Sequence, residues 1–325
     1  MGRRCHAILC GGPCAIALFL AGTQSFPQTY PVRPIRLVVP YPPGGGADNV
    51  ARPIAQKLSE ALGQQVVIDN RGGAAGIIGA DIVAKSKPDG YTLLDDSSSR
   101  AVNPALRKLP FDTLKDFASV GMIVINPNFL VVHPSLPVRT VRDLIRLARE
   151  RPGEIKYASS GVGSAPHMGA ALFQYMAKID LLHVPYKGGG PALADLIGGH
   201  VQLLFPNIAS GLPHVKSGKL RGIAVTSSKR SRSAPQFPTV AESGLPGYEL
   251  HEWNALFAPA GTPQEIIGRL NSELGKILRA PEMQERLFQM GAEAAPGTPE
   301  QLDEYVRREL AKWDKVVKDV GIKVD

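Results

Sequence analysis

Cysteine and aromatic residues are scarce in this chain of 325 residues. The three cysteines, Cys5, Cys10 and Cys14, all lie near the N-terminus, in a segment that we expect to be removed. The remainder has none, which excludes disulfides, thiolate nucleophiles and cysteine-based zinc sites there. Aromatic residues make up only 6%, whereas 34 glycines and 28 prolines predict many short elements joined by tight turns.

Long apolar runs are also lacking. Arg3 and Arg4 precede an apolar stretch at 8–21, and polar residues follow it, which is the three-part pattern of a secretory signal peptide. The apolar part is shorter than the roughly 20 residues that a spanning helix needs. We therefore expect residues 1–26 to be a cleaved signal peptide, with an uncleaved anchor as the alternative.

Charge of one sign is in modest excess. The net charge is +8, and without Arg3 and Arg4 it is +6, from 35 basic and 29 acidic residues. Such an excess attracts small anions. The one dense basic run, SSKRSRSA at 227–234, has no aromatic residue to stack on bases, so we expect a solvated loop and no binding of nucleic acid.

Short Val/Ile/Leu runs alternate with amphipathic segments along most of the chain. This order predicts an α/β fold in which strands of a mostly parallel sheet are covered on both faces. The strands are expected at 35–40, 65–70, 91–94, 155–160, 181–186, 201–206 and 220–227. The helices are expected at 47–62, 76–86, 141–151, 164–178, 191–199, 263–280, 281–291 and 299–321.

The last two long helices have recognisable N-terminal signals. Thr262 is the expected N-cap of one helix, with Pro263 at its first position, and Thr298, Pro299 and Gln301 give the other a similar start. Two β–α series with a helical C-terminal region predict two lobes. We assign residues 27–126 and 250–325 to lobe 1 and residues 127–249 to lobe 2.

Glycine-rich turns follow several of the predicted strands. The stretch PYPPGGGADN lies between the first strand and its helix, and NRGGAAGIIG, SSGVGSAPH and YKGGGPA occupy equivalent places. In a parallel sheet these turns gather where helix N-termini offer N–H donors. We therefore predict a cleft, nearly free of acidic side chains, that selects an anion.

Other sites for anions or catalysis do not fit these turns. There is no GxxxxGK[ST] motif, and Asn49 stands where a dinucleotide fingerprint needs Gly or Ala. No GxSxG motif supports a hydrolase, and no histidine spacing supports a metal site. An exported α/β hydrolase-like enzyme that uses Ser164 and His167 is kept as the alternative function.

The same residues also have purely structural interpretations. The glycines at 44–46 could form only a sharp turn, and Asp48 could interact only with its helix dipole. Ser160 and Ser164 could be helix caps, and His167 an ordinary hydrogen-bonding residue. The sequence leaves these alternatives open.

Seven motifs in order resemble one known family. They are PIRLVVPYPPGGGADNVARPIAQKL, VVIDNRGGAAGIIGADIVAKSKPDGYTLL, NPALRKLPFDTLKDFASV, YASSGVGSAPHMGAALF, HVPYKGGGPALADLIGGHVQLLF, LPHVKSGKLRGIAVTS and FPTVAESGLPGYE. Together they are similar to the Bug receptors, the extracytoplasmic solute receptors of tripartite tricarboxylate transporters. The resemblance extends from about Tyr30 to the C-terminus.

The resemblance implies a type II periplasmic binding protein, a two-lobed Venus flytrap. It further implies a monomer in the periplasm that has no catalytic activity, cofactor or metal and binds a small carboxylate, such as a di- or tricarboxylate, an acidic amino acid or an aromatic acid. The partner would be the membrane subunits of a tripartite tricarboxylate transporter. Carried over, the ligand-binding residues are Tyr41, Gly44, Gly45, Gly46, Asp48, Gly73, Ala74, Ser97, Ser98, Ser160, Gly163, Ser164, His167, Tyr186, Lys187, Gly188 and Asn207.

One position departs from the family pattern. Many relatives read F-D-N where this chain has Phe205, Pro206 and Asn207. An aspartate there could pair with a ligand ammonium group, so its replacement by proline favours a plain organic acid over an amino acid.

Overall fold

The computed structural model describes residues 1–2, 30–44, 46–186 and 188–322. The predicted signal peptide and two predicted ligand-binding residues, Gly45 and Lys187, lie outside the described residues. In the described part of the chain, no helix is both long and apolar enough to cross a membrane.

The first of two sheets has six strands in the order β11-β4-β10-β3-β1-β2. Strand β1 pairs in parallel with β2 and β3, whereas β10 pairs antiparallel with both β3 and β4, and β11 pairs antiparallel with β4. The strands are β1 (Ile35–Val39), β2 (Val66–Asn70), β3 (Thr92–Ser97), β4 (Phe117–Pro127), β10 (His251–Pro259) and β11 (Glu293–Ala294).

The second sheet has five strands in the order β7-β6-β8-β5-β9. Strand β6 is parallel to β7 and β8, and β5 is antiparallel to β8 and β9. The strands are β5 (Phe129–Val132), β6 (Lys156–Ser159), β7 (Leu182–Pro185), β8 (Leu203–Leu204) and β9 (Arg221–Val225). The predicted α/β fold with two lobes is confirmed, and both sheets are mixed because the strands that connect the lobes run against their neighbours.

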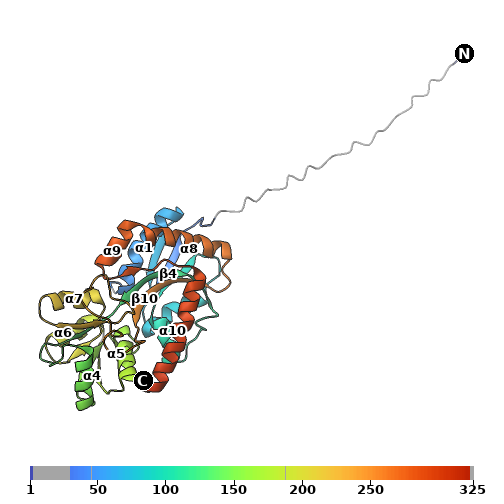
Figure 1. Ribbon diagram of the computed structural model, residues 1–325. Coiled ribbons are helices and arrows are strands. Elements are labelled where there is room, and N and C mark those ends of the chain that lie inside the picture. Colours follow the sequence, from blue (N-terminus) through green and yellow to red (C-terminus); the bar gives the residue numbers. More distant parts are fainter. Residues whose placement is uncertain (3–29, 45, 187, 323–325) are drawn as a thin grey trace.

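Helices flank both sheets (Figure 1). Helices α1, α8 and α9 belong to the lobe of the first sheet, and α4 to α7 surround the second sheet. The long α10 packs on α3 and β4 of the first lobe and also reaches α5 of the second. The helices are α1 (Gly46–Leu62), α2 (Ile77–Ala84), α3 (Ser99–Leu106), α4 (Val141–Glu150), α5 (Ala165–Ala177), α6 (Gly189–Ile197), α7 (Ile208–Lys216), α8 (Gln264–Arg279), α9 (Pro281–Gln289) and α10 (Pro299–Val320), with a short 3₁₀ turn η1 (Ala74–Gly76) before α2.

The chain crosses between the two sheets at two adjacent points. Only Asn128 separates β4 from β5, and the return crossing ends where β10 begins at His251. The backbone N–H of Asn128 donates to Thr226 Oγ1 at 2.7 Å, and the backbone N–H of Leu250 donates to the Thr226 carbonyl at 2.9 Å. Thr226, which is fully buried, thus ties the two crossings together.

The predicted N-caps of helices α8 and α10 have different outcomes in the structure. The predicted start of α10 is confirmed, because Thr298 and Gln301 form a reciprocal capping box. The prediction that Thr262 caps α8 is wrong. Its hydroxyl donates instead to the Pro259 carbonyl at 2.7 Å, and Pro263 occupies the cap position.

Candidate ligand-binding site

A cavity of about 680 Å³ lies between the two lobes. Both sheets contribute to its wall, together with the turns that lead into α1, α6 and α7. Its described lining residues are Gly44, Gly46, Asn49, Val50, Asn126, Ser160, Pro166, Gly189, Gly190, Leu193, Leu204, Pro206, Asn207, Ala209, Ser210, Glu252, Asn254, Met290, Gly291 and Ala292. None of these described residues is a lysine or an arginine.

Three helices begin at this cavity. Gly46 opens α1, Gly189 opens α6, and Asn207 is the N-cap of α7. The first N–H groups of a helix have no partner within it, and the helix dipole adds partial positive charge at the same end. Converging N-termini therefore form a site for an anion without any basic side chain.

The turn before α1 is held by the carboxylate of Asp48. This side chain is fully buried and accepts hydrogen bonds from the Gly44 backbone N–H at 2.8 Å, from Arg52 Nε at 2.8 Å and from Asn70 Nδ2 at 2.9 Å. Burial alone would raise the pKa of Asp48, but the hydrogen bonds from Arg52, Gly44 and Asn70 hold it below its usual value. The carboxylate is thus fully engaged in shaping the turn.

Tyr41 anchors a second hydrogen-bond network beneath this turn. Its hydroxyl donates to Asp96 Oδ1 at 3.1 Å and lies 2.5 Å from the hydroxyl oxygens of Ser97 and Ser99. Burial, with the nearby Asp96 charge, raises the pKa of Tyr41 well above its usual value, so the phenol stays neutral. Gly76 must be glycine here, because its φ is +95° and a Cβ would come within 2.9 Å of the Tyr41 oxygen.

In the second lobe, the turn before α5 brings Ser160 to the cavity, whereas the Ser164 hydroxyl is bonded within the turn itself. The Ser164 hydroxyl donates to the Gly161 carbonyl at 2.7 Å, and His167 Nδ1 accepts from the Gly163 backbone N–H at 3.2 Å. Among the described contacts, no hydrogen bond joins Ser164 to His167. The pairing of nucleophile and base that the alternative enzyme would need is therefore not formed.

His167 instead stacks on a second histidine. Its ring centroid lies 4.2 Å from that of His183, whose Nε2 lies 2.7 Å from Ser159 Oγ. Burial, and then the neighbouring His183, lowers the pKa of His167 to about 3, and burial lowers that of His183 to about 4. Both rings are neutral at physiological pH and have a structural role.

Four of the predicted ligand-binding residues line the cavity: Gly44, Gly46, Ser160 and Asn207. The other described ones lie outside this lining. They are Tyr41, Asp48, Gly73, Ala74, Ser97, Ser98, Gly163, Ser164, His167, Tyr186 and Gly188. The hydroxyl of Tyr186 donates to Asp195 Oδ2 at 2.6 Å, so it is engaged within its own lobe.

Sequence reasoning missed much of the remaining wall. The missed polar residues are Asn49, Asn126, Ser210, Glu252 and Asn254, of which Asn126, Glu252 and Asn254 come from the strand pair β4–β10. No local motif marks them. Glu252 is the one acidic side chain among the described lining residues, in agreement with the expectation of a cleft nearly free of acidic side chains.

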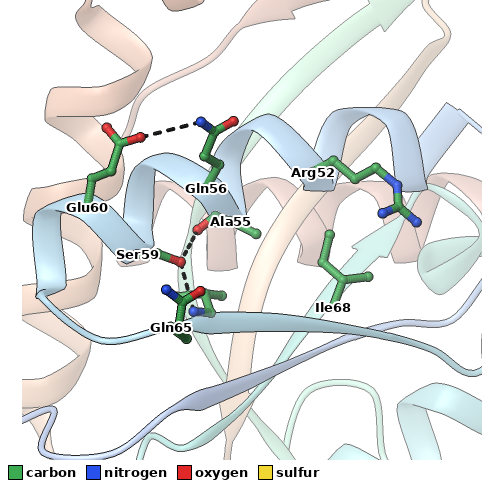
Figure 2. Close-up of a pocket in the computed structure, with 8 residues that line it drawn as sticks. Arg52, Ala55, Gln56, Ser59, Glu60, Gln65 and Ile68 are labelled. Atoms are coloured by element: carbon green, nitrogen blue, oxygen red, sulfur yellow. Dashed lines mark hydrogen bonds between the residues drawn. The ribbon is translucent and has the colours of Figure 1, made fainter.

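A second hollow, of about 620 Å³, lies on the outer side of the first lobe between α1 and the edge strand β2 (Figure 2). Its polar side chains are largely paired with their own neighbours. Gln56 donates to Glu60, and Ser59 Oγ donates to the Ala55 carbonyl while it accepts from the Val66 backbone N–H. No helix N-terminus is among the described residues that line this groove, in contrast to the cavity between the lobes.

Comparison with known proteins identifies the chain. A sequence profile of the family described as the tripartite tricarboxylate transporter family receptor matches residues 50–322. The chain belongs to this family. The receptor is 40% identical to Protein BugT of Bordetella pertussis over 300 residues, which are 91% of this chain and 92% of that protein.

Solved structures agree with the sequence comparison. The receptor superposes on Rpa4515 of R. palustris with adipate at a TM-score of 0.80 and 41% identity, covering 90% of this chain and 99% of that one. It superposes on the periplasmic binding protein BugD at a TM-score of 0.77 and 35% identity, covering 90% and 99%. The protein is thus a solute-binding receptor rather than an enzyme, as the sequence predicts, and its structural relatives are periplasmic binding proteins.

Proposed function

We propose that this receptor binds a small organic carboxylate, a di- or tricarboxylate or an aromatic acid, in the cavity between its lobes. It then delivers the acid to a membrane transporter of the tripartite tricarboxylate type. The observation that carries the proposal is the convergence of the α1, α6 and α7 N-termini on a cavity with no basic residue among its described lining. The adipate in the Rpa4515 structure supports the ligand class.

Binding is proposed to proceed by closure of the lobes around the acid. The lobes would comprise residues 27–126 with 250–325 and residues 127–249, in a monomer exported to the periplasm and freed of its signal peptide. The crossings at Asn128 and Leu250, tied by Thr226, are suited to act as the hinge because both are short and adjacent. Ligand affinity would stabilise the closed state.

The predicted ligand contacts are proposed in two groups. Gly44, Gly46, Ser160 and Asn207 would contact the acid in the cavity as it stands. The predicted residues outside the lining would support these turns or approach the acid only on closure. Pro206 lines the cavity, so the aspartate of many relatives would face the ligand there, and without it a ligand ammonium group has no carboxylate partner at that position.

A thermal-shift screen of carboxylic acids tests the function, with Gly190→Leu as the blocking variant. Gly190 lines the cavity and a Cβ there meets nothing within 4 Å, so we expect a leucine to occupy space that the ligand needs, with circular dichroism as the check that the variant folds. We expect the bound acid to raise the melting temperature of the wild type by several degrees and to lose at least about 100-fold in affinity in the variant.

Gly268→Leu is the matched control. Gly268 lies in α8, where an added Cβ also meets nothing within 4 Å, and it does not line the cavity. The Gly268→Leu variant should bind the acid like the wild type. Equal binding by the wild type, Gly190→Leu and Gly268→Leu would place the ligand outside this cavity. Turnover of the acid that is abolished by Ser164→Ala would instead favour the hydrolase-like enzyme.

A further inference from the structure

The cavity has one charged side chain among its described lining residues, and it is acidic. Glu252 is the second residue of β10, beside the crossing between the lobes. It is half-buried, and no described residue forms a hydrogen bond or ion pair with its carboxylate. A carboxylate that lacks a partner inside a binding cavity must be compensated by water or by the ligand.

Asn126 lies beside Glu252 and points to the same need. The two residues are register partners in the antiparallel pair of β4 and β10. The Oδ1 atom of Asn126 is buried and has no hydrogen-bond partner among the described residues. Buried acceptors are nearly always paired, so this oxygen, like the Glu252 carboxylate, needs a donor from outside the described residues.

The cavity is therefore polarised. Gly46, Gly189 and Asn207 mark the helix N-termini that offer N–H donors, whereas Glu252 and Asn126 offer acceptors from the hinge strands. An acid whose carboxylate meets the donors would turn the rest of its skeleton toward these acceptors. A second bare carboxylate there would repel Glu252.

Burial raises the pKa of Glu252, and among the described residues no cation offsets that rise. A ligand group that donates a hydrogen bond, or carries positive charge, would supply this missing compensation. Pro206 lines the cavity as well, so the acceptor that the chain lacks at that position is present on the hinge strands instead.

We propose that Glu252, with Asn126, is the specificity-determining element of this cavity and selects organic acids that bear a hydrogen-bond donor on their carbon skeleton. The donor is a hydroxyl or an ammonium group, and it faces β4 and β10. This inference rests on the proposed function, because it assumes that a carboxylate occupies the donor side.

Calorimetry with two matched series of acids tests the inference. One series is succinate, malate and aspartate, and the other is adipate, 2-hydroxyadipate and 2-aminoadipate. Within a series only the donor changes. The wild type should bind at least one donor-bearing acid about tenfold more tightly than the unsubstituted acid, as expected for a hydrogen bond to a charged group.

Two substitutions distinguish the two donors. Glu252→Leu removes both charge and acceptor, so the preference for either donor should disappear while the unsubstituted acid binds as well or better. Glu252→Gln keeps an acceptor but not the charge. It should abolish a preference for the amino acid and retain part of a preference for the hydroxy acid.

Glu293→Gln is the matched control, since it makes the same charge change on the nearby strand β11 and its side chain does not line the cavity. It should leave both the affinities and their order unchanged. An unsubstituted acid that binds as tightly as its hydroxy and amino analogues, or an order that Glu252→Leu does not alter, would overturn the inference while leaving the carboxylate receptor intact. Failure to bind these acids and every acid of the thermal-shift screen, tricarboxylates and aromatic acids included, would refute the proposed function itself.

Discussion

The two lobes meet the cavity with turns of different construction. The first lobe contributes one turn before α1, and the buried carboxylate of Asp48 holds it through bonds to Gly44, Arg52 and Asn70. The second lobe contributes the turns before α5, α6 and α7, and the one before α6 leads into Gly189 and Gly190, which carry no side chain that could fix it. The first lobe thus presents a preformed donor frame, and the second presents backbone that can adjust to the ligand.

This difference has a physical basis. A buried charge that is fully paired rigidifies its surroundings, because any movement leaves it without compensation. Gly188, at φ +116°, and the two glycines after it lack that constraint, and a Cβ at Gly190 would meet open space. In a closing receptor the paired frame would define where the carboxylate sits, and the glycine turn would complete the contacts.

The largest effect is expected from Asp48→Ala. The substitution removes a buried carboxylate that accepts from the Gly44 N–H, Arg52 and the Asn70 amide, so we expect the free energy of unfolding to fall by about 3 kcal/mol. Urea denaturation followed by circular dichroism would measure it. The donor frame should loosen too, with a loss of ligand affinity of about tenfold or more.

Ser164→Ala is the corresponding change in the second lobe. It removes only the hydrogen bond from Ser164 Oγ to the Gly161 carbonyl at 2.7 Å, so its cost should be about 1 kcal/mol or less. Equal losses of stability in the two variants would show that the turn held by Asp48 is no more rigid than the turn that contains Ser164.

The lobes should also respond to pH in opposite directions. In the second lobe His167 and His183 have pKa values of about 3 and 4, below the usual 6.5 of histidine. The unfolded chain therefore takes up protons that the folded chain does not, and stability falls as the pH drops from about 6.5 to 4. The expected loss is on the order of 2 kcal/mol, and His167→Asn, which can still accept from the Gly163 N–H, should reduce it.

Asp95 gives the first lobe the reverse dependence. Burial, followed by the nearby charges of Asp96 and Asp48, raises the pKa of Asp95 to about 8, although a hydrogen bond from Asn254 opposes the rise. Its contribution to stability is complete below about pH 4 and is lost as the pH rises through 8. Asp95→Asn should thus stabilise the protein at pH 8 by at least about 1 kcal/mol and have little effect at pH 4. Urea midpoints of the wild type and of the His167→Asn and Asp95→Asn variants, measured across pH 4–8, would test both dependences. If both variants changed with pH in the same way, the assignment of opposite pH dependences to the two lobes would be wrong.

Much of the fold was predictable because most elements carry local signals. The parallel strands β1, β2 and β6 are short apolar runs bounded by turns, and the Thr298–Gln301 capping box sets the start of α10. Helices α3 and α7 and strands β4, β5, β10 and β11 were missed. Both helices contain an internal proline, and β10 is defined by antiparallel partners on either side rather than by its own pattern.

The candidate site divides along the same line. The glycine turn at Gly44 and Gly46 could be predicted, and at Gly44 the backbone requires glycine because its φ is +77°. Glu252 and Asn126 could not, because they reach the cavity only through the register of β4 against β10. The geometry of the turn between β2 and α2 could not be predicted either, because Ala74 and Ala75 adopt φ of 47° and 55°, which is rare for alanine.

The smallest expected effect separates two serines that the resemblance places together in the binding site. Ser160 lines the cavity, so Ser160→Ala should weaken binding of the acid by about three- to tenfold and leave unfolding nearly unchanged. Ser97 lies 2.5 Å from the Tyr41 hydroxyl, inside the network of the first lobe. Ser97→Ala should therefore lower the free energy of unfolding by about 1 kcal/mol and change affinity less. Calorimetry and urea denaturation on both variants would test this. If Ser97→Ala instead abolished binding at unchanged stability, the serine would touch the ligand, and the first lobe would be less preformed than its hydrogen bonds indicate.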